Sequence, residues 1–113
     1  MDIPQVTSLK DASTGGMGQE YLAAGKTVAL RRWEESVKTD NHERCRDYET
    51  VGYVLEGVLE LNLDGQTAEL KPGDSWLVPA GAKHTYRIVE PIVAIEATSP
   101  PARLGHKDEP IAN

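Results

Sequence analysis

The stretch "KPGDSWLVPAGAKH", Lys71 to His84, sets one short strand between two turns. "PG" at 72–73 predicts a tight turn, in which Gly73 allows a backbone angle that a residue with a Cβ resists. "DSWLVP" has the length and composition of a strand, and "PAGA" at 79–82 predicts the next reversal. His84 then begins another strand, so its imidazole would project from a rigid support. The stretch predicts a β-rich fold with a histidine presented at the start of a strand.

Short runs of β-branched and aromatic residues continue on both sides, at intervals of about eight to twelve residues. The runs are "TVALRRW", "TVGYVLEG", "VLELNL", "QTAEL", "SWLVP", "HTYRIV" and "IVAIEA". "DG" at 64–65 is a strong two-residue hairpin signal, and no segment of ten or more residues has a clear helical period. We therefore expect an all-β fold, a compact sandwich or barrel of roughly seven to ten strands.

The composition narrows the classes of function. The 113 residues suffice for one core, and a net charge of −6 with scattered basic residues disfavours nucleic acid as a partner. No apolar run approaches the roughly 18 to 20 residues of a membrane span, so no membrane partner is expected. "MDIPQV" lacks the basic and apolar regions of a secretory signal, and Cys45 alone cannot form an internal disulfide. These features predict a cytoplasmic protein.

The spacing of Gly73, Pro79, Gly81 and His84 matches the second sequence motif of the cupin superfamily, except that Ile88 stands where the motif has asparagine. "YVLEGVLELNLDG" at 53–65 resembles the second half of the first cupin motif. From roughly residue 27 to residue 102 the chain resembles small single-domain bacterial cupins, with a degenerate first motif. The resemblance implies a cupin-type double-stranded β-helix, a jelly-roll barrel of two antiparallel sheets.

The resemblance also suggests a division of the chain and an assembly. Residues 1–26 would form an N-terminal arm, residues 27–99 the cupin barrel, and residues 100–113 a C-terminal tail. Cupin barrels commonly pair through an edge strand, so a homodimer is expected, with the arm exchanged or covering the partner. A barrel that serves mainly to bind a partner remains a further possibility.

The upstream half of the first motif departs from the family pattern. Thr50 stands where the family has glutamate, and the two histidine positions fall on Glu43 and Cys45, or on Arg44 and Arg46. One interpretation is that the loop slips so that other ligands point inward with His84. The metal ligands would then be His84, His42, Cys45 and Glu49, a mixed set that suits a divalent transition metal such as Zn, Fe, Ni or Mn. The protein would be a metal-dependent enzyme of the oxygenase or isomerase class.

The second interpretation, which we favour, is a barrel that binds a polar or anionic small molecule in its lumen, with or without a divalent metal. Side chains alternate along a strand, and the family's glutamate position faces the lumen, so the face of Thr50 should point inward and that of Glu49 outward. The candidate ligand-binding residues are His84, Arg44, Arg46, Tyr48, Thr50 and Tyr86. Whether the protein is an enzyme stays open at this point.

Overall fold

The computed structural model describes residues 3–37 and 43–102. The elements in chain order are a 3-10 turn η1 (Leu9–Asp11) and the strands β1 (Ser13–Thr14), β2 (Gln19–Ala24), β3 (Ala29–Glu35), β4 (Glu49–Leu63), β5 (Gln66–Leu70), β6 (Ser75–Val78) and β7 (His84–Ser99). The prediction of an all-β fold is confirmed. No helix within the two described ranges is long and apolar enough to cross a membrane.

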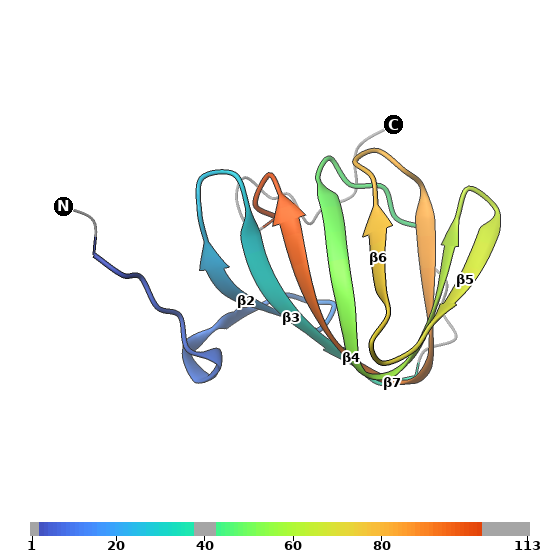
Figure 1. Ribbon diagram of the computed structural model, residues 1–113, viewed down its shortest axis with the longest axis horizontal. Helices are drawn as coiled ribbons and strands as arrows, with labels where there is room; N and C mark the ends of the chain where they lie inside the picture. The colour runs from blue at the N-terminus through green and yellow to red at the C-terminus, as the bar shows by residue number, and fades with distance from the viewer. Residues whose placement is uncertain (1–2, 38–42, 103–113) are drawn as a thin grey trace.

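All strand pairs are antiparallel, in the order β1-β2-β3-β7-β4-β5, with β6 on β4. β4 and β7 are long enough to bend and take part in two layers, which face one another in Figure 1. Their pairing changes register between Val54 and Leu59, where both strands bend. One layer holds β1, β2, β3, β6 and the adjoining halves of β4 and β7, and the other holds β5 and the remaining halves.

A bend within β4 and the turn that follows this strand both depend on glycine. At the bend of β4, Gly57 has a φ of 87°, and a Cβ there would overlap the backbone carbonyl of Pro91. Glycine is therefore required for β4 and β7 to approach at the fold. Asp64 and Gly65, both with positive φ, form the predicted two-residue turn between β4 and β5.

The space between the two layers is divided into an apolar and a polar part. The apolar core consists of Trp33, Val54, Leu59, Leu61, Leu70, Trp76, Val78, Ile88, Ile92 and Ala94. Along β3 the buried positions also include Arg31 and Glu35, and along β4 they include Thr50. The strand alternation that buries the core therefore also brings charged side chains into the barrel.

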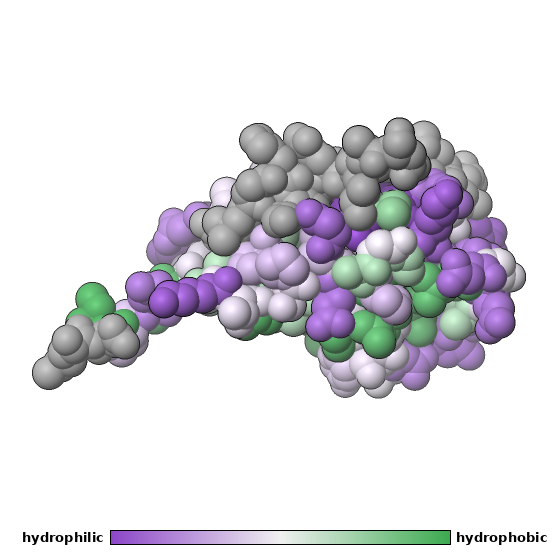
Figure 2. Space-filling view, turned by 90° about the horizontal axis from the view of Figure 1, so that it is seen from above, coloured by the Kyte–Doolittle hydropathy of each residue, from purple (hydrophilic) through white to green (hydrophobic). Residues whose placement is uncertain are grey.

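The layer that contains β3 and β6 also carries an apolar outer face. We define this face by Leu30, Val51, Tyr53, Leu55 and Leu77, which are 39–50% exposed. The strand register places Leu30 and Val51 on either side of Ala97, and Val51 beside Leu77. Hydrophobic side chains gather along one side of the barrel in Figure 2.

The region assigned by sequence to an N-terminal arm has two parts. Gln19–Ala24 forms β2 and pairs with β3, so this part belongs to the sheet. Residues 3–12 extend away from the body (Figure 1), and Ile3, Val6 and Leu9 are 75%, 85% and 46% exposed. The extended part thus presents apolar side chains that do not pack on its own barrel.

Candidate functional site

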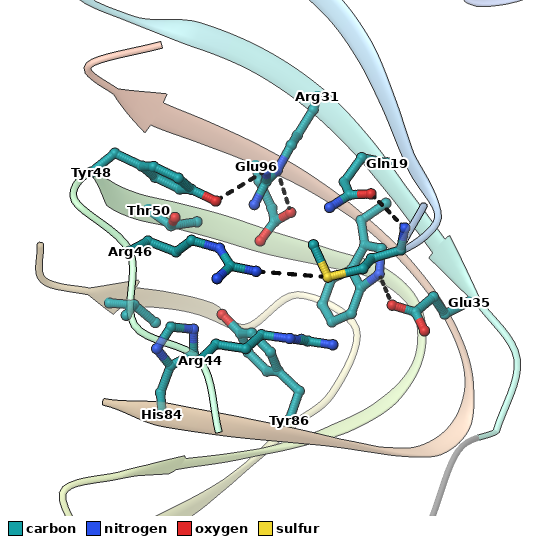
Figure 3. Close-up of a pocket in the computed structure, with 13 residues that line it drawn as sticks. Gln19, Arg31, Glu35, Arg44, Arg46, Tyr48, Thr50, His84, Tyr86 and Glu96 are labelled. Atoms are coloured by element: carbon teal, nitrogen blue, oxygen red, sulfur yellow. Dashed lines mark hydrogen bonds and ion pairs between the residues drawn. The ribbon is translucent and has the colours of Figure 1, made fainter. Parts of the chain in front are cut away.

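A cavity opens between the layers at the polar end of the barrel (Figure 3). It has about 440 Å³ of empty space including its open mouth, but the volume open to the centre of a water molecule is only about 30 Å³. The lining side chains are Met17, Gln19, Arg31, Trp33, Glu35, Arg44, Arg46, Tyr48, Thr50, Val78, His84, Tyr86 and Glu96. The cavity is therefore a narrow, strongly polar space with an aromatic wall.

Arg31 is neutralised inside the cavity by Glu96. Arg31 Nε lies 2.9 Å from Glu96 Oε1, and their side chains are only 9% and 3% exposed. Arg31 Nη1 also donates to the Tyr48 hydroxyl over 3.4 Å. The pair depends on the antiparallel register of β3 with β7, which sets Arg31 opposite Glu96.

Arg46 differs from Arg31 because its charge has no carboxylate partner among its described contacts. Its side chain extends across the middle of the cavity in Figure 3, and the residue is 6% exposed. Nη1 is buried without a hydrogen-bond partner, and Nη2 donates only to the thioether of Met17 over 3.7 Å. A thioether is a weak acceptor, and buried donors in native proteins almost always have partners. The arrangement leaves one guanidinium with two poorly satisfied nitrogens.

The "PAGA" turn and the start of β7 form hydrogen bonds with the backbone of Arg44 and Arg46. Gly81 N donates to the carbonyl of Arg46 over 2.7 Å. Arg44 and His84 exchange two backbone hydrogen bonds of 2.7 and 2.9 Å. The motif that ends in His84 therefore fixes where Arg44 and Arg46 enter the barrel.

His84 is a neutral group in this setting. Its Nδ1 lies 3.0 Å from the carbonyl oxygen of Ala82, which can only accept, so Nδ1 carries the proton and Nε2 the lone pair. Burial lowers the pKa of His84 below its ordinary value, and the charges of Arg44 and Arg46 lower it further, while the Ala82 hydrogen bond acts in the opposite direction. The imidazole thus offers the lumen a hydrogen-bond acceptor.

The lowered pKa predicts a pH dependence of stability. In the unfolded chain His84 takes up a proton at a pKa near 6.5, but in the folded chain only at a lower pH. Between these two pKa values the unfolded state binds more protons, so folding stability falls as the pH is lowered. We expect the free energy of unfolding of the His84→Gln variant to fall less than that of the wild type between pH 7.5 and 5, measured by urea denaturation. Parallel curves over this range would contradict the proposed environment of His84.

Aromatic side chains form one wall of the cavity. The rings of Trp33 and Tyr86 have centroids 5.1 Å apart, and Trp76 Nε1 donates to the Tyr86 hydroxyl over 3.1 Å. Burial raises the pKa of Tyr86 above its ordinary range, and Glu96 adds to this effect, so the phenol stays protonated. The guanidinium of Arg44 lies 5.6 Å from the centre of the same ring.

The structure brings together the side chains of one of the two candidate sets. The cavity is lined by all of the predicted ligand-binding residues: His84, Arg44, Arg46, Tyr48, Thr50 and Tyr86. Their role in binding stays a prediction. Sequence reasoning did not select Met17, Gln19, Arg31, Trp33, Glu35, Val78 or Glu96. The alternation in "ALRRWEE" was a usable signal for Arg31, Trp33 and Glu35, because these positions share one face of a strand.

The proposed metal ligands are not brought together in the described residues. Glu49 is exposed and faces away from the cavity, and Cys45 Sγ contacts the Gly81 carbonyl at 3.4 Å without lining the cavity. His42 lies outside the described residues. The described ranges hold no group of three or more histidine, cysteine or acidic residues suited to a metal ion. With the positive charges of Arg44 and Arg46 acting on His84 and a third guanidinium in the same cavity, this lining does not fit a divalent cation.

Comparison with known proteins agrees with this fold. A family model described as a cupin domain matches residues 33–97. The chain belongs to the cupin family. An RmlC-like cupin from Shewanella frigidimarina is 21% identical with a TM-score of 0.77, covering 92% of this chain and 96% of that one. KdgF from Halomonas sp. is 20% identical with a TM-score of 0.73, covering 88% of this chain and 94% of that one.

A curated relative differs in length from this cupin. The polyketide synthase CurC of Streptomyces cyaneus is 28% identical over 86 residues, which are 72% of this chain and 54% of that protein. The chain therefore spans about half the length of this relative. The cupin fold is established by the family model and the two solved structures. The activity has to be argued from the lumen itself.

Proposed function

We propose that this cupin binds a small anionic molecule in its lumen. The observation that carries the proposal is Arg46, a buried guanidinium whose Nη1 has no partner and whose Nη2 meets only a thioether. A buried unpaired cation is costly to maintain, so its presence is best explained by a ligand that pairs with it. An anion would supply the missing acceptors.

The other charges of the lumen support the same conclusion. Arg31 is paired with Glu96, and Arg44 lies over the face of Tyr86 without a carboxylate among its described contacts. Two guanidiniums thus remain for an incoming ligand. Because the site is largely buried, their attraction for an anion is weakly screened by salt.

A metal-dependent reaction receives less support. The side chains that flank His84 in the described lumen are cationic or aromatic, and Cys45 and Glu49 lie outside the cavity. What the names of KdgF and CurC say of those proteins does not transfer to this chain at 20% and 28% identity. The function proposed here therefore rests on anion binding alone.

A thermal-shift screen tests the proposal. Sodium salts of small carboxylic acids, phosphate and sulfate would be added at constant ionic strength, beside neutral amides of the same acids. At least one anion should raise the Tm of the wild type by mass action, and Arg46→Gln should remove the shift. Arg87→Gln, which alters an exposed arginine paired with Glu60, should retain it. A shift of equal size in the wild type and Arg46→Gln, or no shift with any anion, would refute the proposal.

We also propose that a second copy of the chain covers the apolar outer face. Five large apolar side chains are exposed there, while Ile3, Val6 and Leu9 of the extended segment lack cover on their own barrel. One chain thus carries both an apolar surface and an apolar arm that leaves its own body. A second copy would supply a partner for each, as monomers rarely expose such surfaces.

Light scattering after size exclusion tests this assembly. We expect the wild type to have twice the 12.3 kDa mass of the chain. Tyr53→Glu should reduce the mass to that of one chain, because a carboxylate would be buried in the interface. Val89→Glu, at an exposed position on the half of β7 that belongs to the other layer, should stay dimeric. A monomeric wild type, or a dimer unaffected by Tyr53→Glu, would exclude this interface.

A further inference from the structure

We propose that the anion is a monocarboxylate carried on a flat apolar body, with its carboxylate on Arg46 and its body against the aromatic wall. This inference rests on the proposed function and names the class of ligand. Four features of the lumen distinguish a carboxylate from other anions and from neutral polar molecules.

The first feature is the geometry of the free donors. The two poorly satisfied atoms of Arg46, Nη1 and Nη2, belong to the same guanidinium. Two parallel N–H groups on one plane match the two oxygens of a carboxylate, which can accept both hydrogen bonds at once. Binding would replace the weak contact of Nη2 with Met17 Sδ by a charge-assisted hydrogen bond.

The second feature is the charge of the lining. Three arginines (Arg31, Arg44 and Arg46) and two glutamates (Glu35 and Glu96) line the cavity, so with His84 neutral the formal charges of the lining sum to one positive charge. A ligand with one negative charge neutralises it. A dianion such as hydrogen phosphate would leave an uncompensated negative charge in a buried site close to Glu96 and Glu35.

The third feature is the size of the enclosed space. The enclosed part of the cavity is small, with a volume of about 30 Å³. A planar carboxylate has two oxygens to accommodate there, whereas a tetrahedral oxyanion has four. The body of the ligand would extend from this small space along the lining of the cavity.

The fourth feature is the wall that this body would meet. Trp33 and Tyr86 form a tilted aromatic pair, and Val78 and Met17 also line the cavity. The guanidinium of Arg44, which lies 5.6 Å from the centre of the Tyr86 ring, adds a planar cationic group beside this wall. The wall therefore favours a flat apolar body over a sugar-like polyol, whose hydroxyls would find few partners on these surfaces.

Calorimetric titration of the full chain tests the inference with four probes at one ionic strength: benzoate, acetate, inorganic phosphate and neutral benzamide. We expect benzoate to bind with a Kd at least tenfold lower than that of each other probe. Arg46→Lys keeps the positive charge but loses the planar guanidinium with its two parallel N–H groups. This variant should bind benzoate at least tenfold more weakly. Arg87→Lys, at an exposed ion pair with Glu60, should leave the Kd unchanged. Circular dichroism and the Tm verify that both variants are folded.

The outcomes separate this inference from the proposed function. If phosphate binds as tightly as benzoate and binding still depends on Arg46, the carboxylate class is wrong while the anion site stands. If acetate matches benzoate, the flat apolar body is wrong. If Arg46→Lys binds benzoate as the wild type does, the bidentate contact is overturned. If none of the anions binds, both the inference and the proposed function fail.

Discussion

Replacing Arg46 with methionine is expected to raise the free energy of unfolding of the ligand-free protein by about 1–3 kcal/mol. The guanidinium is buried with Nη1 unpartnered, and its Nη2 contact is the thioether of Met17. A methionine side chain of similar length would remove the unpaired charge and pack against that thioether. Urea denaturation at pH 7 without added anions measures the change.

The same substitution should abolish anion binding, so stability and binding would change in opposite directions. This combination is typical of a group retained for function at the expense of stability. Arg87→Met is the matched control, and its effect should stay within about 0.5 kcal/mol because its ion pair with Glu60 is exposed. A loss of about 1 kcal/mol or more in Arg46→Met, in place of the expected gain, would contradict the prediction. It would show that the guanidinium has hydrogen-bond partners in the ligand-free protein.

Replacing Glu96 with glutamine is expected to lower the free energy of unfolding by about 3–5 kcal/mol. Glu96 is 3% exposed and pairs with Arg31 at 2.9 Å, so the variant would remove the carboxylate that accepts from Arg31 Nε in a buried setting. Chemical denaturation of the wild type and the variant gives the difference. Glu60→Gln, which breaks the exposed pair with Arg87, should change stability by about 1 kcal/mol or less.

A double variant separates the loss of the ion pair from damage to the fold. Arg31→Met together with Glu96→Gln should recover part of the stability lost in Glu96→Gln, because neither residue then carries a buried charge. A loss below about 1 kcal/mol in Glu96→Gln would show that Arg31 does not depend on this carboxylate.

The parts of the lumen predicted correctly from sequence follow from local rules. β4 alternates as the sequence predicts: Thr50, Gly52 and Val54 are buried, while Val51 and Tyr53 are exposed. The same alternation continues upstream, so that Arg46 and Tyr48 are buried. A period of two residues and one family motif were enough to assign the face of Thr50, Gly52 and Val54 to the lumen, whereas the sequence left open which residues of the preceding loop enter it.

The remaining parts depend on contacts between distant segments. Arg31 and Glu96 are 65 residues apart in the chain, and only the register of β3 with β7 makes them partners. Met17 reaches Arg46 because β2 pairs with β3 and carries the preceding glycine-rich turn to the barrel mouth. No local pattern around either residue encodes these pairings, so the unpaired state of Arg46 could be recognised only in the folded chain.

A crystal structure of the protein grown with saturating benzoate would show the ligand and its contacts in the lumen. We expect a carboxylate with its oxygens about 3 Å from Nη1 and Nη2 of Arg46, and with the ring beside Trp33 and Tyr86. A lumen without benzoate at Arg46, or one in which a metal ion bound to Nε2 of His84 holds the benzoate, would contradict this expectation.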